Sequence, residues 1–134
     1  MPINIFEDGK ESRDFVYIDD VVNATIAGIE KPEADGEVFN VGSGVSTTVL
    51  NVAETLIKNY GADVPLQVTG SYRLGDIRHN YANINKIERA LGFKPLMSFA
   101  DGIKKFTDWV NSQAIQQSRY DESIKEMKQK GLMK

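Results

Sequence analysis

Hydrophobic residues recur along this chain at intervals that predict short strands alternating with amphipathic helices. The first 18 residues alternate hydrophobic and polar positions on both sides of the turn dipeptide Asp8-Gly9, which predicts a hairpin-like pair of strands. Residues 37–41 and 65–69 are short apolar runs, and each predicts a further strand. About four short strands are therefore expected.

The first helix is expected over residues 20–30, where aliphatic side chains recur at helical spacing until Pro32 ends the run. Asp19 and Asp20 precede this stretch. Either carboxylate can cap the helix and complement its dipole, so we interpret the pair as caps and not as acid–base groups or metal ligands.

A second helix is expected after the turn at residues 42–44, with Ser46 or Thr47 as its cap and Gly61 at its end. Its apolar face carries Val49, Val52, Leu56 and Tyr60. The Gly-Ser-Gly turn lies between a strand and a helix, as phosphate-binding turns do. It lacks the third glycine of a dinucleotide fingerprint and the Gly-Lys-Ser/Thr of a P-loop, which favours a structural turn.

Two further helices are expected before residue 111. Asn83 or Asn85 can cap a short one that Gly92 closes, and Ser98 with Asp101 resembles a capping box that opens a longer one. Helical spacing predicts that this longer helix buries four apolar side chains, namely Phe99, Ile103, Phe106 and Trp109.

The chain turns polar beyond Asn111. Residues 120–130 read as a charged helix with a weak apolar edge, so residues 112–134 are expected to form a charged helical tail on the surface, separate from a domain at residues 1–111. The predicted fold class is mixed α/β, with few short strands and about five helices.

The apolar strand at residues 37–41, followed by a helix, is typical of parallel sheets, whose strands need neighbours on both sides. With so few strands predicted, one sheet edge is expected to stay open to solvent or to another copy of the chain. We therefore expect the isolated chain to be marginally stable or to self-associate, or to pair with a partner through this edge.

Composition narrows the classes of function. The 134 residues carry a net charge of −3, which gives no reason to expect nucleic acid as a partner. There is no cysteine and a single histidine, so the usual zinc ligand sets cannot be assembled and no metal is expected. No apolar run is long enough for a membrane span, and the first residues lack a signal-peptide pattern, so the expected location is the cytoplasm.

Arginines are the candidate ligand-binding residues. Guanidinium groups stay protonated and present a planar fork of donors that matches phosphate oxygens, so Arg13 and Arg73 from separate loops could clamp one diphosphate. Two alternatives stay open on pattern alone. Both side chains could be ordinary surface arginines or partners of Asp14 and Asp76, and Arg78 could take the place of Arg73. His79 has no partner that the sequence indicates, so we do not assign it a catalytic role.

Several segments in one order carry a resemblance to a known family: Arg-Asp-Phe-Val-Tyr-Ile-Asp-Asp from residue 13, Val-Phe-Asn-Val-Gly-Ser-Gly from residue 38, Tyr-Arg-Leu-Gly-Asp from residue 72, and Leu-Gly-Phe-Lys-Pro from residue 91. Over residues 3–111 the chain resembles the substrate-binding C-terminal portion of nucleotide-sugar epimerases and dehydratases, the extended short-chain dehydrogenase/reductase family. This resemblance implies that the fold lacks the N-terminal Rossmann half of that family.

The resemblance also implies roles for individual residues. Arg13 and Arg73 occupy the positions that contact the nucleotide diphosphate, Phe15 the aromatic position beside the nucleotide, and Asp76 the acid near the ribose. Asn80 stands where galactose-type epimerases have a tyrosine.

The family's catalytic parts have no match in this sequence. It has no Gly-x-x-Gly-x-x-Gly, the NAD-binding turn of the family, and no tyrosine is followed four residues later by lysine. The resemblance thus implies a portion that holds a UDP- or dTDP-sugar in an NAD-dependent 4-epimerase, with no catalytic residue and no cofactor site of its own. The alternatives are the same portion of a 4,6-dehydratase, a truncated non-catalytic interaction module, and a remnant without activity.

Overall fold

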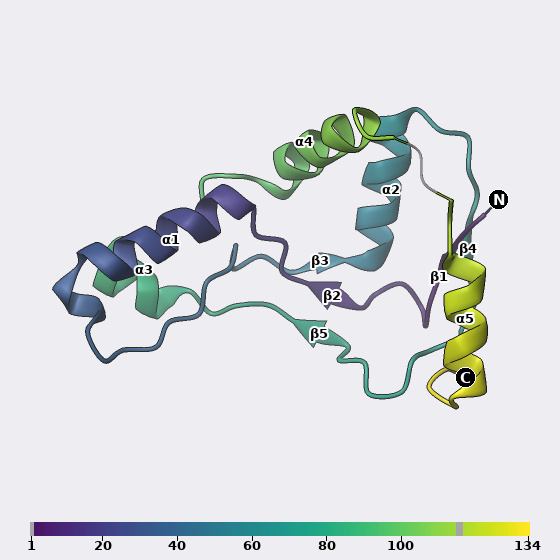
Figure 1. Cartoon of the computed structure of the whole chain (residues 1–134), viewed down its shortest axis with the longest axis horizontal. Coiled ribbons are helices and arrows are strands. Elements are labelled where there is room, and N and C mark those ends of the chain that lie inside the picture. Colours follow the sequence, from purple (N-terminus) through teal and green to yellow (C-terminus); the bar gives the residue numbers. More distant parts are fainter. Residues whose placement is uncertain (1, 115–116) are drawn as a thin grey trace. The chain divides into compact units, whose positions relative to one another are not determined.

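The structure of the chain is a computed structural model that describes residues 2–114 and 117–134. Within these ranges, five α-helices and five short strands confirm the predicted mixed α/β class (Figure 1). The order along the chain is β1 (Ile3–Ile5), β2 (Ser12–Arg13), α1 (Ile18–Glu30), a 3-10 turn (Pro32–Ala34), β3 (Thr47–Thr48), α2 (Val49–Tyr60), β4 (Leu66–Val68), β5 (His79–Asn80), α3 (Asn85–Leu91), α4 (Phe99–Asn111) and α5 (Tyr120–Gln129).

The chain divides into two units. The first contains the segment up to Glu11, Thr48–Arg78 and the segment from Phe106 onwards, and the second contains Ser12–Thr47 and His79–Lys105. Each unit combines segments that lie far apart in the sequence. The predicted division at residue 111 stays a prediction.

The first unit is built on the parallel pairing of β1 with β4, in which Ile3 lies opposite Leu66. Ile5 and Ala53, from β1 and α2, are among its buried side chains. Helix α2 ends at Gly61, as predicted, because this glycine adopts the left-handed conformation (φ 57°) that favours residues without a Cβ. Its cap is Thr48, whose Oγ1 accepts a hydrogen bond from the Asn51 N–H at 3.2 Å, so the prediction of Ser46 or Thr47 was wrong by one or two residues.

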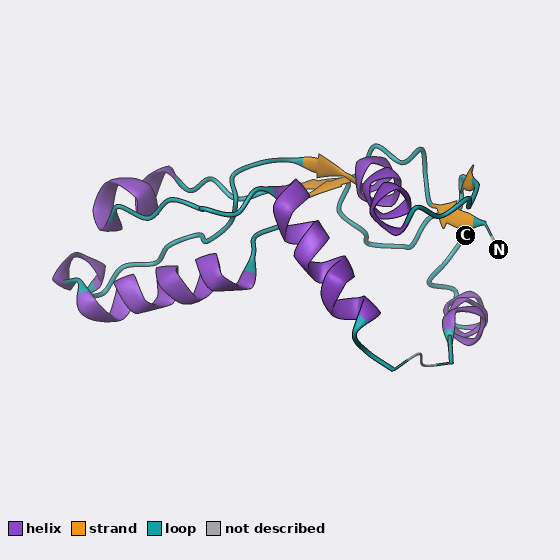
Figure 2. Cartoon of the chain, turned by 90° about the horizontal axis from the view of Figure 1, so that it is seen from above, coloured by secondary structure: helices purple, strands orange, loops and turns teal. Residues whose placement is uncertain are grey.

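The second unit has its core between α1 and α3, which lie side by side in Figure 1 and Figure 2. Ala24 of α1 packs there with Ile87, Leu91 and Phe93. Helix α3 ends at Gly92 (φ 67°), as predicted. Strand β2 pairs in parallel with β5 and contributes the backbone on which the candidate site is built.

The carboxylate of Asp20 joins α1 to the loop that precedes α4. It is buried and accepts hydrogen bonds from the N–H groups of Leu96 at 3.0 Å and Met97 at 3.1 Å. Helix α1 begins at Ile18, with Tyr17 at the cap position and no side-chain cap. The predicted capping role of Asp19 or Asp20 was therefore wrong, because both residues lie inside the first turn, where their charge still complements the helix dipole.

Two predicted strand features were also wrong. The first 18 residues form no hairpin, because β1 and β2 each pair in parallel with a later strand. Residues 37–41 form no strand either, although the Lys86 ammonium donates to the Val38 carbonyl at 2.8 Å. Regular strand structure requires a neighbour with free backbone groups, and the described part of the chain supplies none to this segment.

Helix α4 opens as predicted, since Ser98 Oγ accepts a hydrogen bond from the Asp101 N–H at 3.1 Å. Its predicted burial was only half right. Phe99 and Ile103 are partly buried, whereas Phe106 is 49% and Trp109 59% exposed. The helical spacing of these side chains was predicted correctly, but the described residues leave the C-terminal part of this face exposed.

Among the described residues, no helix is both long and apolar enough to cross a membrane.

Candidate functional site

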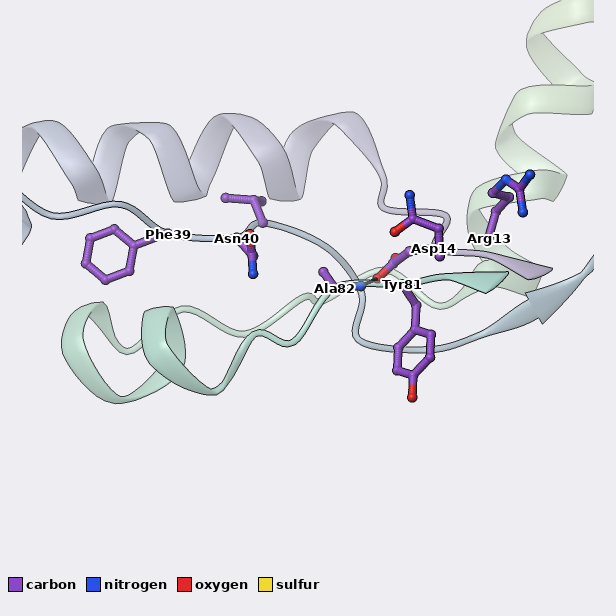
Figure 3. A pocket seen from close by; sticks show the side chains of 8 residues that line it. Arg13, Asp14, Phe39, Asn40, Tyr81 and Ala82 are labelled. Atoms are coloured by element: carbon purple, nitrogen blue, oxygen red, sulfur yellow. Dashed lines mark hydrogen bonds between the residues drawn. The ribbon is translucent and has the colours of Figure 1, made fainter. Parts of the chain in front are cut away.

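Arg13 lies at a cavity of about 450 Å³ in the second unit (Figure 3). The parallel register of β2 and β5 places Arg13 opposite Asn80, so two of the five predicted binding residues share this cavity. Three short segments from separate parts of the chain line it: Arg13 and Asp14, Phe39 to Val41, and Asn80 to Ala82. The guanidinium of Arg13 and the side-chain amides of Asn40 and Asn80 are groups that can bind a polar ligand.

Asp14 holds these segments together. Its carboxylate accepts hydrogen bonds from the N–H of Ser43 at 2.7 Å, the hydroxyl of Ser43 at 2.6 Å, the N–H of Gly44 at 3.0 Å and the N–H of Ala82 at 3.1 Å. Partial burial raises the pKa of the carboxyl, but these donors outweigh burial and hold its pKa below the usual range.

The Gly-Ser-Gly turn is shaped around this carboxylate. A Cβ on Gly42 would lie 2.5 Å from the Ala82 Cβ and 2.6 Å from Asp14 Oδ2, so only glycine fits. Gly44 has a φ of 71°, again the left-handed region. Because the N–H groups of Ser43 and Gly44 bind Asp14, the turn is structural, as expected, and its donors are occupied by the protein itself.

Ser12 and His79, the residues before Arg13 and Asn80, join β2 to β5 by their side chains. Ser12 Oγ and His79 Nδ1 are 2.9 Å apart, and Ser12 is buried. The sequence indicated no partner for His79, and the ladder register provides one. The contact fixes the register beside Arg13 and leaves the role of His79 structural.

Phe15 lies outside the residues that line the cavity. Its ring packs at a tilt against Phe99, with centroids 5.3 Å apart, and it remains partly exposed. Its predicted position beside a nucleotide stays a prediction.

The other two predicted residues belong to the first unit. Arg73 donates to Asp76 Oδ2 from Nε at 3.0 Å and from Nη2 at 2.7 Å, and its guanidinium lies 6.0 Å from the centre of the Phe6 ring. The pair is exposed, and an exposed pair of this kind contributes only about 0–1 kcal/mol. Since Arg13 and Arg73 belong to different units, their joint clamp stays a prediction.

Arg78, the alternative to Arg73, is engaged elsewhere in the first unit. It donates to Glu7 Oε2 at 2.8 Å and to Asp8 Oδ2 at 2.7 Å. The hydrogen bonds that Arg78 donates to the Asp8 carboxylate lower the pKa of Asp8 and raise the pKa of Arg78. Two carboxylates thus hold this guanidinium, whereas one holds that of Arg73.

The sequence prediction missed the organising role of Asp14 and the cavity residues Asn40 and Tyr81. The adjacency of Asp14 to Arg13 was visible, but its donors Ser43 and Ala82 lie far along the chain and no local pattern points to them. Figure 3 shows the Tyr81 side chain pointing away from that of Arg13, on the other side of the strands.

This chain is similar to proteins of known families. The family model described as "GDP-mannose 4,6 dehydratase" matches residues 2–106. The chain is 38% identical over 108 residues to a dTDP-L-rhamnose 4-epimerase of Burkholderia thailandensis, a match that covers 81% of this chain and 30% of that protein.

Two solved structures of 4-epimerases are also similar to this chain. The UDP-glucose 4-epimerase of Thermotoga maritima with UDP-glucose is 35% identical with a TM-score of 0.72, over 82% of this chain and 35% of that one. The UDP-glucuronic acid 4-epimerase of Bacillus cereus, in complex with UDP-glucuronic acid and NAD, is 32% identical with a TM-score of 0.73, over the same shares. The chain thus spans about a third of the length of these relatives.

Proposed function

Because this chain belongs to the nucleotide-sugar epimerases and dehydratases of the extended short-chain dehydrogenase/reductase family, we propose that it is the UDP- or dTDP-sugar-binding portion of an NAD-dependent 4-epimerase. The observation that carries the proposal is the cavity at Arg13 and Asn80, which lies within the family match and is framed by the Arg-Asp-Phe and Val-Phe-Asn-Val-Gly segments. The expected cytoplasmic location belongs to the same proposal, and fractionation of cells that make the chain tests it.

In this proposal each arginine supplies charge-assisted hydrogen bonds to a diphosphate. Such bonds contribute about 1.5–3 kcal/mol each. Two arginines therefore contribute substantially to the affinity but do not by themselves give tight binding. Arg73 exchanges Asp76 for phosphate, and the released Asp76 carboxylate accepts a ribose hydroxyl. Asn80 donates or accepts beside Arg13, and Phe15 offers an aromatic face to the nucleotide.

The redox step belongs to residues that this sequence does not contain. NAD supplies hydride transfer in the complete enzyme, and the residues present do not fit it, because the sequence has neither a glycine-rich dinucleotide turn nor the Tyr-x-x-x-Lys pair. We therefore assign binding and orientation of the nucleotide end to this chain and no catalytic step. The chain alone is expected to be inactive.

Epimerisation is proposed ahead of dehydration. The matching family model carries a dehydratase description, but the matched relative of Burkholderia thailandensis and both solved structures are 4-epimerases. A 4,6-dehydratase portion is the alternative within the same binding chemistry.

The test is an amide NMR titration of the 134-residue chain with UDP and with dTDP. We expect shifts around residues 13–15 and 73–80, and at least about a hundredfold weaker affinity in the double variant Arg13→Ala with Arg73→Ala, the amount that the loss of about 1.5 kcal/mol from each arginine gives. The matched control is Arg89→Ala, an exposed arginine that bonds to its own helix at Asn85. Unchanged affinity in the double variant would remove the site assignment.

A second candidate function, an interaction module, is favoured by one face of α1. Ile18, Val22, Ile26 and Ile29 follow one another at helical spacing, and all four are exposed. The opposite face of the same helix buries Ala24 in the core. A helix that is apolar on both faces is ordinarily covered on both.

We propose that the NAD-holding portion of an enzyme of this family covers this face, supplied by a longer polypeptide or by a separate one. The support is that the chain spans about a third of relatives whose structures hold NAD and nucleotide sugar together. Co-expression with the remaining two thirds of a relative should yield a complex, which Val22→Gln with Ile26→Gln should disrupt without lowering the melting temperature of the chain. Sedimentation as a symmetric dimer that the same variant dissociates would instead identify a second copy as the occupant.

A further inference from the structure

The C-terminal residues pair with the loop that carries Arg73. The Tyr72 N–H donates to the Lys134 carbonyl at 2.8 Å, the Lys134 N–H donates back to the Tyr72 carbonyl at 3.0 Å, and the Leu74 N–H donates to the Leu132 carbonyl at 2.9 Å. Arg73 lies opposite Met133 in this short antiparallel pairing. All of these residues belong to the first unit.

The end of α5 directs the chain back toward the loop, as Figure 1 shows at the yellow end. The Leu132 N–H donates to the Met127 carbonyl at 2.9 Å and the Gly131 N–H to the Lys128 carbonyl at 3.1 Å. Gly131 has a φ of 66°, so these bonds form the Schellman motif that reverses a chain after a helix. The reversal is therefore encoded by Gly131.

Side-chain packing anchors the same segment. Met133 is only 8% exposed, and with Phe6, Ser71 and Ile124 it lines a cavity of about 260 Å³ beneath the loop. Phe6 is also the ring over which the Arg73 guanidinium lies. The tail thus fixes the backbone of the loop and contributes to the surface on which its arginine rests.

The Arg73 loop needs such an anchor. Gly70 (φ 72°) and Gly75 (φ 82°) flank it, and both positions are conformationally permissive. The pairing with the tail engages the backbone of Tyr72 and Leu74 and leaves the Arg73 side chain 50% exposed, held by the exposed pair with Asp76. The contact immobilises the loop without covering the guanidinium.

We propose that residues 132–134 are a clasp that positions Arg73 for a nucleotide diphosphate. The tail then raises the affinity of the site by fixing the conformation of the Arg73 loop before the ligand binds. The clasp lies beyond residues 2–106, the part that matches the family model, so it is a feature of this chain in addition to the family match. Positioning of a binding group before the ligand arrives removes part of the ordering cost of binding. This inference rests on the proposed function.

The experiment compares the full chain with two variants, deletion of residues 132–134 and Gly131→Ala, which strains the reversal while keeping every later residue. Gly36→Ala is the matched control, because Gly36 is also left-handed (φ 72°) with open space around its Cβ position and lies in the second unit. The probes are UDP, which carries the diphosphate, and uridine, which does not.

Hydrogen exchange at the Tyr72 and Leu74 amides should accelerate at least about tenfold in both variants, while the Thr69 amide, bonded to Ile5, is unchanged. UDP affinity should fall about five- to twentyfold and uridine affinity should stay constant, a selectivity that general loss of structure would not produce.

Each contrary result has a separate meaning. Unchanged exchange would show that no clasp exists. Faster exchange with constant UDP affinity would remove its positioning role, and faster exchange with higher affinity would make it an inhibitory contact, which also overturns the proposal. Absence of UDP binding by the full chain would overturn the proposed function and with it the positioning role, while the exchange data alone would still decide whether the clasp forms.

Discussion

The carboxylate of Asp14 accepts two hydrogen bonds from Ser43, one from the backbone N–H at 2.7 Å and one from the hydroxyl at 2.6 Å. This contact joins the residue after Arg13 to the turn that follows the 37–41 segment. Together with the bond from Ala82, it ties this turn and the 80–82 segment to one side chain of the cavity.

Replacement of Asp14 by alanine should lower the free energy of unfolding by about 1–3 kcal/mol, because the N–H groups of Ser43, Gly44 and Ala82 lose their acceptor. Denaturant titration measures the change. Asp63→Ala removes an exposed aspartate and serves as the control, with no change expected. Equal stability of the two variants would contradict the organising role of Asp14.

Low pH should reduce the stability that the hydrogen bonds of Asp14 contribute. The pKa of Asp14 is lower in the folded chain than the usual value of about 3.9, so its contribution is fully present above that pH and is lost as the pH falls through the folded pKa. Thermal melts between about pH 6 and pH 2.5 should show a steeper loss of stability below pH 4 for the natural chain than for Asp14→Asn. Parallel curves for the two proteins would rule out this linkage.

A methyl group at Gly42 should be far more damaging than one at Gly28. At Gly42 the Cβ would overlap Ala82 and the Asp14 carboxylate, whereas nothing lies within 4 Å of the same position at Gly28. Gly42→Ala should lower the free energy of unfolding by about 1–3 kcal/mol, and Gly28→Ala, inside α1, should raise it by up to about 1 kcal/mol. Opposite signs in chemical denaturation are the expected result.

Short sequence motifs correctly predicted those helix ends that depend only on neighbouring residues. Gly61 and Gly92 closed their helices where expected, and Ser98 with Asp101 opened α4. The 37–41 strand failed because backbone pairing depends on a neighbour, and the burial of Phe106 and Trp109 failed because it depends on a covering layer. Neither condition is encoded in the segment itself.

The candidate site likewise combines contacts between residues close in sequence, which could be predicted, with contacts between distant residues, which could not. Arg73 and Asp76 are three residues apart, so their pairing was one of the alternatives that the pattern left open. The meeting of Arg13 with Asn80 follows from the register of two distant strands, and the contact of Tyr72 with Lys134 from a tail that the sequence indicated only as a surface helix. Long-range pairing leaves no local signal.

Arg78 and Arg73 should respond differently to truncation. Arg78→Ala breaks exposed contacts with Glu7 and Asp8, and UDP affinity should stay within about twofold of the natural value because no phosphate contact is lost. Arg73→Ala should weaken UDP at least about tenfold. Isothermal calorimetry at constant ionic strength distinguishes the two, and a reversal of these effects would assign the diphosphate to Arg78.

The parallel pairings of β1 with β4 and of β2 with β5 carry a consequence for the order in which the chain folds. Each joins a strand near the start of the sequence to one beyond its midpoint or close to it, with both α1 and α2 in between. Contacts of such long sequence separation form slowly, since a large loop must close before any ladder bond rewards it. During synthesis β1 must therefore stay unpaired until β4 has left the ribosome, whereas β2 can pair earlier with β3 and gains its second neighbour only with β5.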